Sequence, residues 1–345
     1  MPTNKWILPE GIEDILPEQA YWLEQKRREV IDTFLSYGYG LVIPPMIEYH
    51  DSLLSNSSED LDLQTFKLID QETGKQLGLR ADITSQISRI YSTYDDKNKV
   101  NRYCYFDHVV RTKNVDSKES RIPIQAGAEL IGNSAINNDA ELVILMLDIV
   151  KKFTKKRIFL DIGHVGIFKK LIKCANLKIE QEKQIKKLIR SKSSSEIKKY
   201  LNDVDADKSI KDCISNFPKM HGLIKDINKD LNQLKIFDDN IKNDVDYMIN
   251  LCNLVGVKHK DVEIKYDFCE LQGFDYENDV IFSAYIEKDS REAALGGKYA
   301  LGDGNMSGIG FSMDVRHLIK NQSLEKKLVN KDGKWKVEGA KWIKV

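Results

Sequence analysis

The sequence has little of what marks several protein classes. Its 5 cysteines are an odd number, and no two stand close enough to form a Cys-x-x-Cys metal or redox pair, so we interpret them as buried thiols in a reducing cytoplasm. No apolar run approaches the roughly 18 residues that span a membrane, and the first ten residues have no signal-peptide pattern. The 53 basic and 53 acidic side chains cancel, which gives no general affinity for nucleic acid or membrane surfaces. We therefore expect a soluble cytoplasmic protein with no membrane partner.

Self-contained catalytic motifs are also missing. The glycine-rich stretches 296–298 and 302–304 lack the spacing of a phosphate-binding loop and of a dinucleotide-binding fingerprint. The metalloprotease pattern His-Glu-x-x-His and the hydrolase pattern Gly-x-Ser-x-Gly do not occur, and the 6 histidines show no metal-ligand spacing. We expect neither a metal nor a cofactor.

What the chain does contain is enough apolar sequence for a large core. It has 345 residues, of which 41% are hydrophobic and 31% charged, and this length allows two domains or one large domain with an insertion. Periodicity and turn residues predict the first elements. These are a helix over 18–37, a short buried strand at 41–43, a hairpin over 65–80 with Gly74 at its tip, a helix that follows Asp82, strands at 103–111 and 122–132 forming an antiparallel pair, and a helix over 140–152 capped by Asp139.

The character of the sequence changes after a strand at 157–162. From 165 to 260 it is lysine-rich, helix-periodic and nearly free of strand signals, which indicates a helical insertion. Strand patterns resume at 262–266 and 280–286, and a helix follows around 313–320. The pattern of strands on both sides of a helical segment predicts one mixed domain interrupted by a second, helical one. The lysines favour a solvated helical face, with a contact region as the alternative.

The last segment carries Asp332-Gly333 between two alternating stretches, 328–331 and 334–337, which predicts a hairpin. The expected organisation therefore has three parts. They are a discontinuous core of residues 1–164 and 261–322, a helical insertion of residues 165–260, and a C-terminal β-hairpin tail of residues 323–345.

Polar residues interrupt several otherwise apolar strands. Gln125 and Glu129 lie on one face of the expected strand at 122–132, with Gly127 between them leaving room above the sheet. Further members of this dispersed set are Arg80, Asp82, Arg111, Arg121, Asp275 and Tyr276. Taken singly, Gln125, Glu129 and Arg121 are most often ordinary surface or edge-strand residues. Together they favour a pocket for a small zwitterion with a ring nitrogen, because buried polar groups need partners.

Several continuous segments then point to a family. They are residues 8–14, 59–68, 79–84, 123–129 and 308–314. With these segments, the chain resembles the class II aminoacyl-tRNA synthetases of the histidyl branch, and most of all their non-aminoacylating paralogues, the ATP phosphoribosyltransferase regulatory subunits. The resemblance runs to about Leu318. It implies an α+β fold, a class II aminoacyl-tRNA synthetase-like catalytic core with a six-stranded antiparallel sheet flanked by helices and a helical insertion, and a homodimer interface from the first helix through Pro45.

The resemblance also implies a histidine-binding site. Asp82 and Thr84 match the positions that hold the substrate amine, and Gln125 and Glu129 match those that hold the amine and the imidazole. Arg111 matches the arginine of motif 2, Tyr299 matches a tyrosine beside the ring of the substrate, and Tyr276 matches another residue of the histidine-binding site.

The departures from the synthetase pattern concern the nucleotide. Lys113 replaces a glutamate that helps to bind ATP, Gln272 replaces an arginine that stabilises the α-phosphate, and His317 stands where the arginine of motif 3 clamps the triphosphate. Arg316 is one residue early, and is therefore rotated by roughly 100° about the helix. Three such losses, each worth on the order of 3 kcal/mol, would slow adenylation by roughly six orders of magnitude if additive.

The implied function is that of a non-catalytic regulatory subunit. It would partner the short-form catalytic subunit of ATP phosphoribosyltransferase in the first step of histidine biosynthesis, with histidine as feedback effector, as a homodimer within a larger hetero-oligomer such as an octamer. No tRNA is expected, because the 28 residues after His317 are too few for an anticodon-binding domain. The alternatives are an active synthetase-like ligase or aminoacyl transferase, and a stand-alone amino-acid sensor.

Overall fold

The computed structural model describes residues 7–54, 59–94, 99–113, 120–132, 135–270, 277–301, 306–320, 334–338 and 341–344. The chain forms two compact units, unit 1 with residues 1–129, 149–155 and 312–345, and unit 2 with residues 130–148 and 156–311. The expected α+β class is confirmed. The expected division into a core, a helical insertion and a tail stays a prediction. The two compact units follow different boundaries.

Unit 1 opens with the predicted long helix, α1 (Pro17–Ser36). Its apolar stripe buries Val30 and Phe34, and the chain turns at Gly38, whose φ of 81° suits a residue without a side chain. The strand β1 (Gly40–Leu41) then pairs in parallel with β5 (Asn101–His108), which neighbours β6 (Ile124–Gly132). The parallel pair corrects the expectation of a purely antiparallel sheet.

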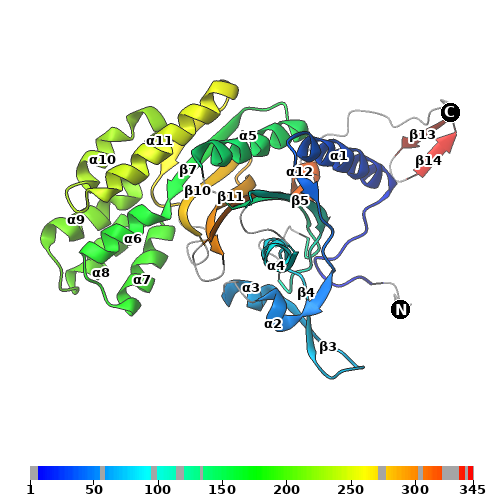
Figure 1. Cartoon of the computed structure of the whole chain (residues 1–345), viewed down its shortest axis with the longest axis horizontal. Helices are drawn as coiled ribbons and strands as arrows, with labels where there is room; N and C mark the ends of the chain where they lie inside the picture. Colours follow the sequence, from blue (N-terminus) through cyan, green and yellow to red (C-terminus); the bar gives the residue numbers. More distant parts are fainter. Residues whose placement is uncertain are drawn as a thin grey trace, which may run out of the picture. The chain divides into compact units, whose positions relative to one another are not determined.

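A second, smaller sheet of unit 1 has the order β2-β4-β3. The predicted hairpin is confirmed as β3 (Phe66–Ile69) and β4 (Gln76–Leu79), and β2 (Ile47–Tyr49) pairs with the other edge of β4. The short helices α2 (His50–Leu53) and α3 (Glu59–Gln64) and the longer α4 (Thr84–Tyr94) complete this region, which Figure 1 draws in blue and cyan. Strand β4 therefore leads directly into the turn before α4.

The C-terminal part of unit 1 contains α12 (Val315–Lys320) and a hairpin of β13 (Trp335–Glu338) and β14 (Lys341–Lys344). A hairpin was expected in the tail, but with its turn at Asp332-Gly333. The strand 335–338 pairs with the segment after it, and the expected turn at Asp332-Gly333 and first strand at 328–331 lie outside the described residues.

Unit 2 holds strands in the order β12-β11-β10-β7-β9-β8. Their bounds are β7 (Ile158–His164), β8 (His221–Leu223), β9 (Glu263–Asp267), β10 (Glu277–Ile286), β11 (Glu292–Leu301) and β12 (Met306–Asp314). Strand β10 is antiparallel to both β7 and β11, whereas β7 and β9 are parallel, so the sheet is mixed.

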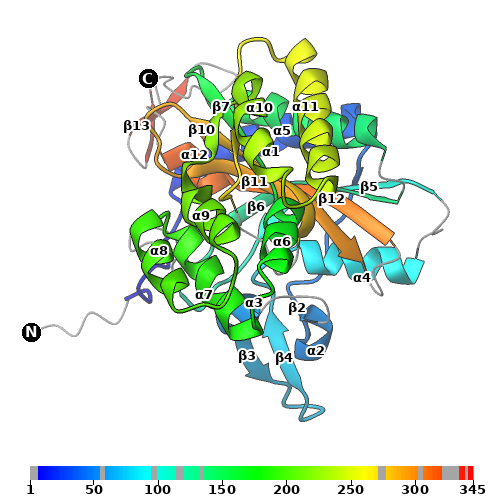
Figure 2. The same ribbon diagram turned by 90° about the vertical axis from the view of Figure 1, so that its left-hand side faces the viewer.

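The predicted helical stretch between β7 and β9 is found in unit 2. It contains α6 (Val165–Cys174), α7 (Ile179–Arg190), α8 (Ser194–Asn202), α9 (Lys208–Asn216), α10 (Asn228–Leu234) and α11 (Asn240–Lys258). Figure 2 shows α6 to α9 gathered together, and α11 packs against α6 and β7. The stretch is not wholly helical, because β8 pairs with β9. Within the described residues, no helix combines the length and the hydropathy needed to cross a bilayer.

Two smaller expectations need correction. Helix α5 spans Ile136–Phe153, so Asp139 lies in its first turn and is not its cap. Its carboxylate is fully buried and contacts other side chains, described below. Of the cysteines, Cys174 is exposed, and only the other four are buried.

Candidate amino-acid-binding site

The turn that joins β4 to α4 forms the centre of the candidate site. Asp82 Oδ2 accepts a hydrogen bond from the backbone N–H of Thr84 at 2.8 Å, a local bond that favours the start of a helix there. The amide of Gln125, on β6, bridges to this turn: its Nε2 donates to Asp82 Oδ1 at 2.8 Å and its Oε1 accepts from Ile83 N at 3.0 Å. The side chain of Asp82 is therefore fixed in place by neutral donors on both of its oxygens.

Glu129 extends this chain of contacts along the same face of β6. Its side chain is buried, and Oε1 accepts hydrogen bonds from Thr84 Oγ1 at 3.1 Å and from Tyr105 Oη at 3.3 Å. Burial raises the pKa of Tyr105 well above its usual range, and the charges of Glu129 and Asp82 add to this effect. Tyr105 thus stays a hydroxyl donor at all ordinary pH values. Asp82, Thr84, Gln125 and Glu129 are brought together as predicted.

Tyr105 was not among the residues predicted for this site. A signal was available, because this tyrosine lies in the middle of the strand predicted to pair with 122–132, and a buried tyrosine hydroxyl usually finds a hydrogen-bond partner. The resulting cluster combines two carboxylates with an amide and two hydroxyls. Such a set suits a ligand that carries an ammonium group and ring N–H groups, because carboxylates form their strongest hydrogen bonds with charged donors.

The three arginines near this turn make different contacts. Arg111 lies beside it, with Nε donating to the carbonyl of Ala81 at 3.4 Å, and its backbone N–H bonds to Arg121 O at 2.8 Å. Arg121 packs its guanidinium over the ring of Phe66, 5.0 Å from the centroid. Arg80 is only 1% exposed and is held by protein groups on several sides, so it is part of the structure of unit 1.

Of the two tyrosines predicted for the site, the structure describes only Tyr299. Tyr299 is a buried residue of β11 in unit 2, and its ring lies against Gly308 of β12, where an added Cβ would come within 2.7 Å of the ring. Tyr276 and Gln272 lie outside the described residues.

Two cations near the expected nucleotide side, Lys113 and Arg316, are described by the structure. Lys113 is exposed. Arg316 binds the N-terminal segment: Nη2 donates to Glu13 Oε1 at 2.8 Å, and Nη1 donates to Ser120 Oγ at 2.9 Å and to Ile122 O at 3.2 Å. The guanidinium of Arg316 is thus used within unit 1.

Comparison with known proteins identifies the family of the chain. The family model of histidyl-tRNA synthetase matches residues 11–318. The ATP phosphoribosyltransferase regulatory subunit of Methylococcus capsulatus is 36% identical over 331 residues, which cover 94% of this chain and 81% of that protein. The protein of the same name from Thioalkalivibrio sulfidiphilus is 35% identical over 323 residues, covering 92% and 82%.

Solved structures show the same fold. The ATP phosphoribosyltransferase regulatory subunit/histidyl-tRNA synthetase from Bacillus halodurans superposes with a TM-score of 0.81 at 22% identity, covering 92% of this chain and 83% of that one. A chain of the ATP phosphoribosyl transferase complex from Thermotoga maritima has a TM-score of 0.66 at 18% identity, covering 84% and 96%. The chain belongs to the histidyl-tRNA synthetase family, and relatives that match most of its length are ATP phosphoribosyltransferase regulatory subunits.

Proposed function

We propose that the chain is the non-catalytic regulatory subunit of ATP phosphoribosyltransferase in the first step of histidine biosynthesis. The relatives that it matches over most of their length carry this name, and a similar chain occurs in the complex from Thermotoga maritima. The chain works with a short-form catalytic subunit, which joins ATP to phosphoribosyl pyrophosphate. Its place is the cytoplasm, and it needs neither tRNA nor a cofactor.

One observation carries the assignment of a non-catalytic role. The groups that match the amine-binding side of a synthetase form a continuous chain of hydrogen bonds from Gln125 through Asp82 and Thr84 to Glu129. Arg316, the cation nearest in sequence to the triphosphate clamp of motif 3, is occupied by Glu13, Ser120 and Ile122. A site that holds an amino acid without stabilising a nucleotide's charge binds the amino acid but does not activate it.

Histidine is the effector that fits the site. Asp82 and Gln125 receive its ammonium group, and Glu129 receives its imidazole N–H. Arg111 and Tyr299 are assigned to histidine binding by their match to the family. Tyr276 belongs to the same set by that match.

The subunit acts as a homodimer within a larger hetero-oligomer, such as an octamer. Exposed apolar side chains near α1 and the two following strands support the homodimer, because such surface is usually covered by a partner. They are Leu35, Ile43, Ile47 and Tyr49.

The test reconstitutes the chain with a short-form catalytic subunit and measures ATP phosphoribosyl transfer at increasing histidine concentrations. We expect transfer to depend on this chain and to be inhibited by histidine. Glu129→Gln, which keeps the shape but removes the charge, should raise the histidine concentration for half-inhibition about tenfold or more, as expected for a lost charged hydrogen bond. Glu263→Gln is the matched control, because Glu263 lies on β9 and its carboxylate is paired with Arg157. A transferase indifferent to this chain would refute the proposal.

Two further measurements separate the rival functions. Histidine-dependent exchange of pyrophosphate into ATP by the isolated chain would identify an active ligase, and we expect no exchange above background. Size-exclusion chromatography of the two coexpressed proteins distinguishes a regulatory subunit from a stand-alone sensor, since only the former elutes with the catalytic subunit.

A further inference from the structure

The ladder between β10 and β11 is irregular next to Tyr299. Ile281 pairs with Gly297, and the next pair along the strands joins Glu277 to Tyr299. Three residues of β10, 278–280, therefore oppose the single residue Lys298 of β11. Such a bulge interrupts the backbone hydrogen bonds and re-aims the neighbouring side chains. Other contacts must fix the strands at this place.

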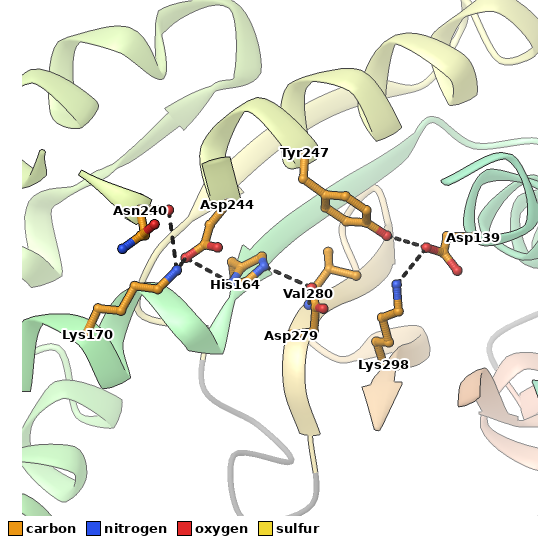
Figure 3. A network of polar contacts seen from close by, with 9 residues as sticks. All are labelled: Asp139, His164, Lys170, Asn240, Asp244, Tyr247, Asp279, Val280 and Lys298. Carbon is orange, nitrogen blue, oxygen red and sulfur yellow. Dashed lines mark hydrogen bonds and ion pairs between the residues drawn. The ribbon is translucent and has the colours of Figure 1, made fainter. Parts of the chain in front are cut away.

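On the β11 side, Lys298 is held by a buried ion pair (Figure 3). Its Nζ lies 2.9 Å from Asp139 Oδ2, and the two side chains are 8% and 0% exposed. Tyr247, on α11, donates its hydroxyl to the same carboxylate oxygen, and its ring lies under the ammonium group, 5.2 Å away. Burial raises the pKa of Tyr247, and the charge of Asp139 adds to this, so the hydroxyl stays protonated. Breaking such a pair leaves a buried charge without its partner, which is strongly unfavourable.

On the β10 side, Asp279 lies within the bulge and is held by His164. His164 Nε2 is 2.9 Å from Asp279 Oδ1. Burial raises the pKa of Asp279, but the hydrogen bond and charge of His164 and the charge of Lys298 outweigh it, so the pKa is lowered and the carboxylate stays ionised. The ring of His164 meets that of Tyr247 edge-on, with centroids 6.4 Å apart, which joins the two halves of the network.

The network also reaches the helical stretch through a second residue of α11. Asp244 Oδ2 lies 3.9 Å from His164 Nδ1 and is bound by Lys170 of α6. Figure 3 shows these side chains in one row from Lys170 to Asp139. Helix α6 packs against β10, and α11 contacts Lys298 of β11 through the ring of Tyr247.

We propose that this network is a clamp that fixes the bulge and thereby orients Tyr299, so that Tyr247 and Asp139 are positioning residues for Tyr299. Tyr299 follows Lys298 directly, and the two side chains point to opposite faces of β11. Gly308 supports the ring of Tyr299 from β12, and the clamp holds the backbone behind it. The lysine-rich helical stretch then helps to orient Tyr299, in addition to forming a solvated surface. This inference rests on the proposed function for the role of Tyr299 in histidine binding.

The first test compares Tyr247→Phe with Tyr266→Phe. Tyr266 is a matched control, because its hydroxyl donates to Asp230 at 2.6 Å within the same unit but on β9, away from the bulge. Isothermal titration of the full-length chain should show histidine binding weakened about fivefold or more in Tyr247→Phe and less than about twofold in the control. The ratio of the affinities for histidine and thienylalanine should fall only in Tyr247→Phe, since Tyr299 serves the imidazole ring. Equal effects in the two variants would refute the clamp.

A double-mutant cycle with Tyr299→Phe gives a second test. If Tyr247 acts through Tyr299, the effect of Tyr247→Phe on histidine affinity should shrink to less than about twofold in the Tyr299→Phe background. Additive effects would contradict the proposal.

Fluorine NMR decides the case independently of histidine binding. With 3-fluorotyrosine at position 299, the fluorine resonance should shift or broaden in Tyr247→Phe and stay unchanged in Tyr266→Phe. If the wild-type chain fails to bind histidine, the proposed function fails and the two binding tests no longer bear on the clamp, but an unchanged fluorine resonance in Tyr247→Phe would still refute the clamp.

Discussion

Arg80 offers the sharpest test of what stabilises unit 1. Its guanidinium is 1% exposed and donates to three partners: Nη1 to Pro44 O at 2.7 Å, Nε to His108 O at 2.8 Å, and Nη2 to Asp107 Oδ2 at 2.8 Å. These contacts join the segment after β1, the end of β5 and the turn before α4. The substitution Arg80→Met keeps much of the apolar stem but removes all three bonds.

The expected cost is about 4 to 5 kcal/mol in the free energy of unfolding. Removing one member of a buried ion pair costs about 3 to 5 kcal/mol, and an unsatisfied buried carbonyl adds about 1 to 3 kcal/mol. The lower part of the combined range applies, because the side chain of Asp107 is 28% exposed and regains some hydration. Urea unfolding followed by circular dichroism measures the difference. Arg28→Met, at an exposed i,i+4 pair with Glu24 on α1, is the control and should cost less than about 1 kcal/mol.

The stability difference between wild type and Arg80→Met should also depend on pH. Burial raises the pKa of Asp107, but the hydrogen bond from Arg80, with further bonds and charges, lowers it more, so the folded pKa lies below the unfolded one. A carboxylate of this kind stabilises the fold above its unfolded pKa, and this contribution is lost as the pH falls through the folded pKa. The difference between wild type and Arg80→Met should therefore be largest near pH 7 and shrink below about pH 4. A difference under about 1 kcal/mol at pH 7, the range of an exposed ion pair, would refute the reasoning.

Three further outcomes follow from local packing. Because Cys174 is exposed and burial raises the pKa of Cys104 to about 12, a thiol reagent should modify Cys174 of the native chain well before Cys104, as peptide mapping would show. Gly296→Ala places a Cβ 2.3 Å from a backbone carbonyl oxygen, so we expect insoluble or unfolded protein, detected by circular dichroism. Lys26→Met on α1 removes a buried ammonium group that donates to Lys152 O at 2.6 Å, and thermal unfolding should show a loss of about 1 to 3 kcal/mol; no change would contradict this role.

The elements that the sequence predicted best are those with a regular apolar period. Helix α1 shows this, because Val30 and Phe34 recur at helical spacing and Gly38 ends the segment. The hairpin of β3 and β4 was predicted equally well from its turn residues. Elements whose existence depends on a distant partner were missed or misplaced. Strand β8 is only three residues long and exists through its pairing with β9.

The same distinction holds for the candidate site. Asp82, Gln125 and Glu129 were predictable because each is a polar residue in or beside an apolar strand. Tyr105 was missed, because nothing in its own segment marks it and only the expected pairing of its strand with 122–132 points to its partner Glu129. Asp139 was taken for a helix cap from its local position, whereas its partner Lys298 lies 159 residues further along the chain. Local patterns cannot distinguish a capping carboxylate from one that pairs with a distant cation.

A buried charged side chain is therefore not by itself a sign of a ligand site in this chain. The hydrogen-bond partners of the side chain distinguish a ligand site from a structural contact. Arg80 meets a carboxylate and two carbonyl oxygens, which satisfy its charge and its geometry within the protein. Asp82 is also fixed by two hydrogen bonds, but both come from neutral donors, the N–H of Thr84 and the amide of Gln125. Neutral donors orient a carboxylate and leave its attraction for a cation in place. Asp82 is thus held ready for an ammonium group, while Arg80 has no comparable capacity left for a ligand.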